Sequence, residues 1–314
     1  MKRLFLLLAV VGMLFTACSD SKSAKPTSPS DNEIWYTTTD GKPLVLSNCN
    51  LSQFNVKDKD GNKSRGVNVS FISNTYSNGR GVLKFSKWAV SDFIKCGIFR
   101  NQSTLESVIL PNSLECIEAD AFYGCSSLTS ITIGNSVTDI SDQAFYGCSS
   151  LTSINIPESV TWIGDYAFND CSNLININIP ESVKKIENYA FNGCSSLTSI
   201  NIPKSVTNIG EYAFNGCSSL TSINLPENET LRIGAFAFKG CSSLTSIIIP
   251  ENVIAEEHAF RGCSLTSITF LDLRPYLFFH RLGIPSTTTI YVPKEAVEAY
   301  MNASVNREQI KPIE

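Results

Sequence analysis

Between residues 99 and 270 the order of apolar and polar positions returns every 22 to 24 residues. In the clearest copy, residues 144–157, it reads Ala-Phe-Tyr-Gly-Cys-Ser-Ser-Leu-Thr-Ser-Ile-Asn-Ile-Pro. A fixed period in this range indicates a solenoid in which each copy forms one coil. Two columns keep the register, the cysteines Cys125, Cys148, Cys171, Cys194, Cys217, Cys241 and Cys263 and the phenylalanines Phe99, Phe122, Phe145, Phe168, Phe191, Phe214, Phe238 and Phe260.

Each copy predicts one strand and one returning segment. Ile154 and Ile156 alternate with polar residues, which is typical of a half-buried strand. Pro157 ends the strand, because proline cannot donate a hydrogen bond to a sheet. A second apolar pair, Val160 and Ile163, then closes the coil and leads to the next cysteine.

The residue before the cysteine indicates a particular backbone conformation. It is glycine in most copies, as in Gly147 and Gly193, and aspartate in one, Asp170. Both residue types tolerate a positive φ better than most others do, so we predict a positive φ at this position in every coil.

A coil of about 23 residues cannot bury a core alone, whereas stacked coils cover each other's apolar edges. The predicted fold is therefore a mainly β repeat solenoid, with the cysteine and phenylalanine columns as structural ladders inside it. Neighbouring cysteines in such a stack lie within the distance of a disulfide. However, side chains in register point the same way and small buried thiols are common core residues, so we expect reduced packing residues.

The array resembles the BspA-like leucine-rich repeats of bacterial surface proteins, through the recurrent Ala-Phe-x-Gly-Cys-Ser-Ser-Leu-Thr-Ser-Ile-x-Ile-Pro and the Ser-Val-x-x-Ile that follows it. The resemblance implies a leucine-rich-repeat-like, right-handed stack of about eight 23-residue coils over residues 89–270. In the commonest leucine-rich consensus the cysteine follows the strand. Here the cysteine comes before the strand, three residues ahead of the first leucine. A smooth horseshoe backed by helices is therefore not expected.

The segment before the array, residues 33–88, is rich in aromatic and β-branched residues between turn signals such as Asp40-Gly41 and Asn78-Gly79. This pattern predicts short strands and hairpins. A separate module of this size would have a marginal core, so we interpret it as a β-rich N-terminal cap. Its Ile-Trp-Tyr-Thr opening also resembles the segment that precedes the array in the BspA-like family.

The segment after the array, residues 271–314, breaks the repeat. Residues 290–292 predict one further strand, and residues 294–302 place Val297, Tyr300 and Met301 at helical spacing. We interpret this segment as an irregular or helical C-terminal cap.

The first 17 residues look like a signal peptide, because Lys2 and Arg3 precede an apolar run too short for a comfortable membrane span. Thr16-Ala17-Cys18 resembles a bacterial lipobox, which implies cleavage before Cys18 and acylation of its thiol. Cleavage without a lipid is the alternative. Residues 18–32 contain no aliphatic residue larger than alanine and predict a flexible, lipidated tether. The expected location is the outer membrane, with the protein lipid-anchored and exposed at the cell surface.

The chain carries 25 basic and 29 acidic residues, a net charge of −4, and has no basic run. Nucleic acid is therefore disfavoured as a partner, and so is charge-driven binding to anionic lipid. The only histidines are His258 and His280, and there is no C-x-x-C pair, phosphate loop or nucleophile elbow. We predict no catalytic residue, no metal site and no cofactor.

Two surface stripes remain as candidate ligand-binding sites. Aromatic side chains can support sugar rings or anchor a protein partner. Alternatively, both stripes result from copying one repeat, and the aromatic rings pack on each other. The stripes consist of the aromatic residues Tyr166, Tyr189, Tyr212 and Phe236, with Trp162 nearby, and of the polar residues Asn155, Asn178, Asn201 and Asn224.

The predicted function is that of a cell-surface binding or adhesion lipoprotein without enzyme activity. The family resemblance implies host extracellular-matrix or cell-surface proteins, or other bacteria, as partners. One alternative is a surface polysaccharide-binding protein that serves glycan uptake. A further alternative is an extracytoplasmic hydrolase, which would need paired carboxylates, or His280 beside an acid, in a cleft.

Overall fold

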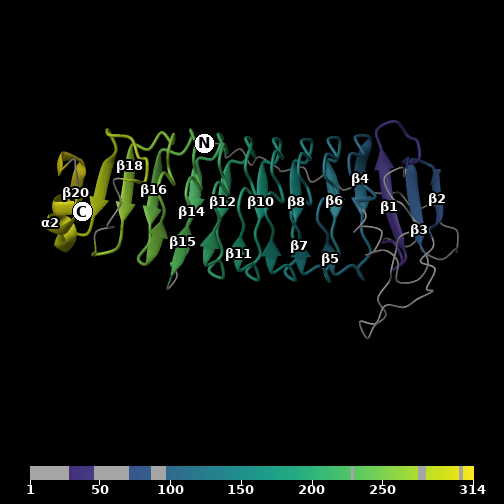
Figure 1. Ribbon diagram of the computed structural model, residues 1–314, viewed down its shortest axis with the longest axis horizontal. Coiled ribbons are helices and arrows are strands. Elements are labelled where there is room, and N and C mark those ends of the chain that lie inside the picture. The colour runs from purple at the N-terminus through teal and green to yellow at the C-terminus, as the bar shows by residue number, and fades with distance from the viewer. Residues whose placement is uncertain (1–27, 46–70, 86–96, 228–229, 275–280, 304–306) are drawn as a thin grey trace, which may run out of the picture.

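The repeats form a long stack of coils, seen from the side in Figure 1. This computed structural model describes residues 28–45, 71–85, 97–227, 230–274, 281–303 and 307–314. The predicted signal peptide, the predicted lipidation site Cys18 and most of the predicted tether lie outside the described residues. The coils follow one another along the long axis, with strand β2 near one end and helix α2 near the other (Figure 1).

The strand predicted after each cysteine is present, and each such strand pairs in parallel with the corresponding strand of one neighbouring coil. Ile154 lies opposite Ile177 in β8 and β10, and Asn155 lies opposite Asn178. The isoleucines face the core because successive side chains of a strand point to opposite faces. These strands are β4 (Leu105–Ile109), β6 (Ser130–Thr132), β8 (Ser153–Asn155), β10 (Asn176–Asn178), β12 (Ser199–Asn201), β14 (Ser222–Asn224), β16 (Ser246–Ile249) and β18 (Ser267–Phe270).

A second strand in each coil was not predicted from the sequence. It contains the isoleucine of the returning segment, such as Ile163, and the residue before it, and it joins a seven-stranded parallel sheet. Its members are β5 (Cys116–Ile117), β7 (Asp139–Ile140), β9 (Trp162–Ile163), β11 (Lys185–Ile186), β13 (Asn208–Ile209), β15 (Leu231–Ile233) and β17 (Val253–Ala255).

The turn that carries Ala-Phe-x-Gly-Cys forms a third side of each coil. Backbone hydrogen bonds link it to the next coil, for example from Phe168 N to Ala190 O at 2.7 Å. The predicted positive φ before the cysteine is confirmed, at 70° for Gly147 and 57° for Asp170. A second column with positive φ, which includes Tyr189 at 57°, was not expected.

The two ladders fill the centre of the stack. All eight phenylalanines of the column are fully buried, and neighbouring rings are nearly parallel. Phe191, for example, stacks at 5.2 Å on both Phe168 and Phe214. The seven cysteines are buried free thiols, and each donates to the carbonyl of an earlier phenylalanine, as in Cys194 Sγ to Phe168 O at 3.2 Å.

At the N-terminal end, β1 (Glu33–Thr38), β2 (Phe71–Ser77) and β3 (Arg80–Phe85) form an antiparallel sheet. Strand β1 also pairs with β4 of the first coil, so this sheet continues directly into the array. Pro29 is buried, and Asn32 Nδ2 donates to Phe85 O at 3.0 Å. The last residues of the stretch predicted as a flexible tether therefore pack against this sheet, because Asn32 bonds the backbone at its edge.

At the C-terminal end the sheet does not stop at residue 270. Strand β19 (Thr289–Val292) pairs in parallel with β18, and β20 (Ile310–Pro312) pairs with β19. The predicted helix consists of η2 (Lys294–Ala296) and α2 (Val297–Ala303), with Tyr300 fully buried, and the 3-10 turn η3 (Arg307–Gln309) precedes β20. The final segment thus covers the last coil while extending its sheet by two strands.

Candidate binding surfaces

Strands β8, β10, β12 and β14 each present an asparagine at the same outward position, and the outward position two residues earlier is serine in three of them and Asn176 in β10. Their asparagines, which we call the Asn face, are all exposed, and Asn224 Nδ2 donates to Asn201 Oδ1 at 2.7 Å. The face is uncharged, and each member has nearly the same neighbours as the next. It therefore offers a repeated environment without one position that differs from the rest. The Asn face consists of Asn155, Asn178, Asn201 and Asn224.

A separate stripe of half-buried rings, which we call the aromatic ridge, follows the turns of the coils. The ring centroids of Tyr166 and Tyr189 are 4.6 Å apart, and those of Tyr189 and Tyr212 are 4.9 Å apart, with interplanar angles of 4° and 5°. Phe236 and His258 continue the row at 4.8 and 5.0 Å. The rings thus cover each other's faces, and only their edges remain for a ligand.

This stacking has consequences for sugar binding. A pyranose ring packs against the open face of an aromatic ring, and along the ridge those faces contact other rings. Burial and the neighbouring phenols Tyr166 and Tyr212 raise the pKa of Tyr189, so its hydroxyl stays protonated at neutral pH. The geometry favours the interpretation that the ridge stabilises the stack, and it does not favour the uptake of glycans along this stripe.

The second sheet carries an outward row in which the chemistry changes from coil to coil, and we call this row the mixed column. Each member precedes an inward residue of the same strand; Lys185, for example, precedes the fully buried Ile186. The parallel register places Lys185 between Trp162 and Asn208. In order along the stack, the mixed column is Asp139, Trp162, Lys185, Asn208, Arg232 and Ile254.

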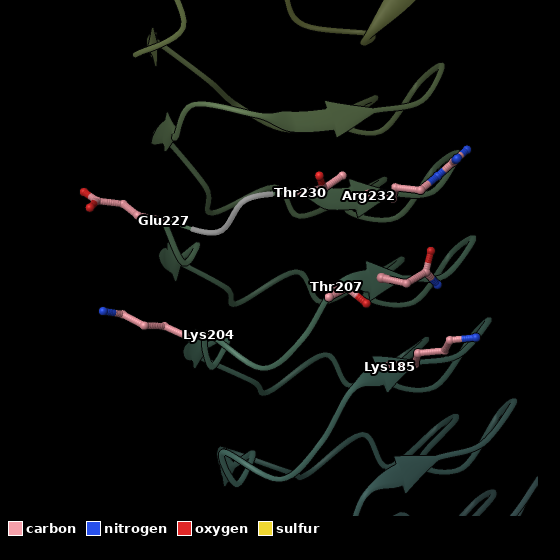
Figure 2. A pocket seen from close by; sticks show the side chains of 7 residues that line it. Lys185, Lys204, Thr207, Glu227, Thr230 and Arg232 are labelled. Carbon is pink, nitrogen blue, oxygen red and sulfur yellow. The ribbon is translucent and has the colours of Figure 1, made fainter.

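An open groove of about 800 Å³ lies over the middle of the mixed column. Figure 2 shows Lys185 and Arg232 extending along one side of it and Lys204 and Glu227 along the other, with Thr207 and Thr230 between them. We call it the basic groove, because three of its charged side chains are cationic. Its lining residues are Lys185, Lys204, Thr207, Asn208, Glu227, Thr230 and Arg232.

The basic groove differs from the coils before it in charge. Residues 101–183 contain ten aspartates and glutamates and no lysine or arginine, whereas Lys184, Lys185, Lys204 and Arg232 follow within the next 50 residues. Arg232 forms an ion pair with Glu256 at 3.1 Å, in which both side chains are exposed. The solenoid thus has an acidic N-terminal part and a cationic patch near its middle.

The structure separates the candidates that the sequence placed together. Trp162 lies on the mixed column, whereas Tyr166 lies on the aromatic ridge and Asn155 on the Asn face. The cations of the basic groove were missed, although two signals were present. One is the absence of basic residues from residues 101–183, just before Lys184. The other is the 24-residue interval between Cys217 and Cys241, which adds a residue between Pro226 and Ile233.

Other kinds of site find no support in the described part of the chain. It contains no group of three or more histidine, cysteine, aspartate or glutamate side chains that could hold a metal ion. His258 belongs to the aromatic ridge, and His280 lies outside the described residues. No helix among the described residues is both long and apolar enough to cross a membrane.

Comparison with known proteins identifies the family of the repeats. A family model described as the BspA type leucine-rich repeat region matches residues 92–186 and 163–280 in six copies. The matches together span more than half of the 314 residues. The chain belongs to the BspA-type leucine-rich repeat family. In this BspA-type protein the phenylalanine, cysteine and isoleucine positions of the repeat form the core, and the mixed column lies among its variable positions.

Among solved structures, a leucine-rich repeat protein from Eubacterium ventriosum is 32% identical with a TM-score of 0.46, and the match covers 51% of this chain and 43% of that protein. The BspA-type chain therefore matches less than half of that protein's length. A leucine-rich repeat protein from Bacteroides ovatus is 25% identical (TM-score 0.43; 65% and 67% covered). A leucine rich cell surface protein from Faecalibacterium prausnitzii is 28% identical (TM-score 0.38; 69% and 62% covered). No curated protein matches the chain.

Proposed function

We propose that this BspA-type protein is a binding or adhesion protein of the bacterial surface and that the mixed column is its contact site for a partner protein. The observation that carries the proposal is the change of side-chain type along the mixed column while the buried core repeats unchanged. A specific contact requires a surface whose side chains differ from those around it. The Asn face and the aromatic ridge repeat nearly the same side chain from coil to coil and do not provide such a surface.

The residue types of the mixed column also suit a protein partner. Tryptophan and arginine are enriched among the residues that dominate binding energy, and both occur here. Trp162 is half-buried, and its Nε1 donates to Glu187 Oε1 at 3.2 Å, which fixes the indole ring before any partner arrives. A side chain held in place in this way loses little conformational freedom on binding.

For the partner we propose host extracellular-matrix or cell-surface proteins, with the surface of other bacteria as a second possibility. The support is membership of the BspA-type family together with the sequence signals for export. The basic groove does not favour a hydrolase, because its lining contains a single carboxylate, that of Glu227, and neither histidine nor cysteine.

The contact site can be tested with Trp162→Ala. We expect the mature protein to bind at least one member of a panel of immobilised matrix proteins and intact bacterial cells. The substitution should weaken that binding about 30-fold, which corresponds to about 2 kcal/mol. Surface plasmon resonance measures Kd, and thermal melting checks that the fold is retained. Asn178→Ala on the Asn face is the control and should leave Kd within about twofold. A loss of affinity with Asn178→Ala but not with Trp162→Ala would place the contact on the Asn face and contradict the proposed site.

The proposed location has its own test. We expect the wild-type protein to fractionate with membranes and to be degraded when intact cells are treated with protease. Cys18→Ala should release it into the soluble fraction, because an acylated cysteine supplies the anchor. Protection of the wild-type protein in intact cells, combined with degradation after lysis, would argue for a periplasmic protein instead.

A further inference from the structure

We propose that the segment of the partner that lies on the mixed column is an extended peptide with acidic residues between apolar ones. This rests on the proposed function and specifies the chemistry of the partner. From Trp162 to Ile254 the column reads aromatic, cation, amide, cation, aliphatic. The complement of this order is an apolar residue at each end and carboxylates between them.

The cations in the middle are available to an incoming carboxylate. Among the described residues, neither Lys185 nor Lys204 has an acidic side chain within ion-pair distance. Arg232 is paired with Glu256, but an exposed ion pair is worth about 0–1 kcal/mol, so a carboxylate of the partner can compete for it. Glu227 is the one acidic residue that lines the groove, and it lies on the side of Lys204.

The length of the column defines the length of the peptide. Four strand-to-strand steps separate β9 from β17 in the sheet. At about 4.8 Å per step the column from Trp162 to Ile254 spans about 19 Å. An extended chain rises about 3.3 Å per residue, so about six steps cover this distance, and a chain of about seven residues places its first and last side chains on the same face. A helix of the same span would need about twice as many residues.

The apolar ends of the column favour a peptide over an anionic polysaccharide. A polyanionic glycan would use Lys185, Lys204 and Arg232, but it would gain nothing from the exposed aliphatic side chain of Ile254. Ile254 has 47% of its surface exposed, and burying it under an apolar residue of the partner is favourable. A peptide with leucine-like ends uses both apolar positions and the cations between them.

The charge of the solenoid surface also determines where along the stack an acidic peptide binds. An acidic peptide is repelled by residues 101–183, which carry ten acidic and no basic residues, and is attracted to the cations that follow. Repulsion from the acidic coils and attraction by the groove both act over about 10 Å at moderate ionic strength. The peptide is therefore expected to settle over β11, β13 and β15 and to bind more weakly as salt is added.

The test uses the full mature chain and a fluorescein-labelled peptide of about seven residues, with leucine at both ends and glutamates between them. Fluorescence anisotropy at low salt is expected to give saturable binding. A peptide with glutamines in place of the glutamates should bind at least about tenfold more weakly. Lys185→Glu and Arg232→Glu should each weaken binding of the glutamate peptide by at least about tenfold. Arg261→Glu, an exposed charge reversal of the same size outside the groove, should change it less than about twofold.

Several results would overturn the inference. One is equal affinity for the glutamate and glutamine peptides. Another is an equal loss of affinity for the glutamate peptide in Lys185→Glu and Arg261→Glu. A third is binding of heparin but not of the peptide, which would assign the groove to polyanionic glycans. If Trp162→Ala still weakens binding to a surface protein while the charge reversals do not, the peptide chemistry fails and the proposed function stands. If the mature chain binds no protein or cell of the panel, the proposed function itself fails.

Discussion

Raising the pH from about 8 to about 10 is expected to lower the free energy of unfolding by about 3 kcal/mol through two thiols of the cysteine ladder, Cys125 and Cys217, alone. Burial raises the pKa of Cys125 and Cys217 to about 12 from the ordinary value of 9.0. Burial also raises the pKa of Cys148, Cys171 and Cys194, and for Cys241 the contact with the Cys263 thiol is the largest cause, followed by burial.

The direction follows from which state loses protons first. Above pH 9 the exposed thiols of the unfolded chain ionise, while the buried thiols of the folded chain stay protonated. The stabilising contribution is therefore complete below pH 9 and is lost as the pH rises toward the folded pKa. At pH 10 each of the two thiols whose folded pKa is about 12 costs about 1.4 kcal/mol, and the two together give the total above. The other buried thiols add to the loss in the same direction. Such a loss is a large fraction of the stability of a typical domain.

Chemical denaturation between pH 8 and pH 10 measures this effect, and variants isolate the thiols from other titrating groups. Cys194→Ala should reduce the number of protons released on unfolding by about one. Val183→Ala, which truncates a fully buried side chain that does not titrate, should lower stability at every pH without changing that number. An unchanged pH dependence in Cys194→Ala would contradict the origin of the effect in the ladder.

The core of this solenoid could be predicted because each buried position recurs at the same interval. Phe191 and Cys194 take their register from identical neighbours one coil away, so the repeat alone places them inside. The strand around Ile200 was equally visible, because two inward isoleucines alternate with polar residues and a proline follows. Repetition converts a weak local pattern into a strong one.

The second sheet could not be predicted in the same way. A strand such as β11 has two residues, and only Ile186 points inward, so no alternation exists to be recognised. The sheet forms because stacking places seven equivalent segments side by side, which is a tertiary effect. Without that sheet, Trp162, Lys185 and Arg232 looked unrelated in the sequence, and their common row became visible only through the register of the strands.

The positive φ angles along the aromatic ridge could not be predicted from the sequence, because tyrosine and phenylalanine rarely adopt a positive φ. Asp120 occupies this column at 59° and is a residue type expected there, but Tyr166 and Tyr212 adopt 57° and 54° as well. Such a conformation costs about 1–2 kcal/mol for a residue with a Cβ atom. Ring stacking and the backbone bonds between coils offset this cost, so the tyrosines hold a conformation that their own propensity disfavours.

The phenylalanine ladder leads to the second large effect, which concerns Phe191→Ala. We expect this substitution to destabilise the protein by about 3–5 kcal/mol, because it leaves a cavity in a fully buried site. Phe191 also stacks on two rings, Phe168 and Phe214, at 5.2 Å each, so the loss reaches both neighbouring coils. In a solenoid each coil depends on its nearest neighbours, and a gap in the middle weakens two interfaces at once.

Urea denaturation followed by circular dichroism measures the change, and two variants control for it. Phe260→Ala removes an equally buried ring that stacks on one other ring of the ladder, Phe238, at 5.7 Å, so its cost should be smaller. Asn201→Ala removes an exposed amide that accepts one hydrogen bond from Asn224 and should cost less than about 1 kcal/mol. Equal shifts for Phe191→Ala and Asn201→Ala would contradict the assignment of inside and outside. Equal shifts for Phe191→Ala and Phe260→Ala would show instead that the stack loses stability coil by coil, without coupling through the rings.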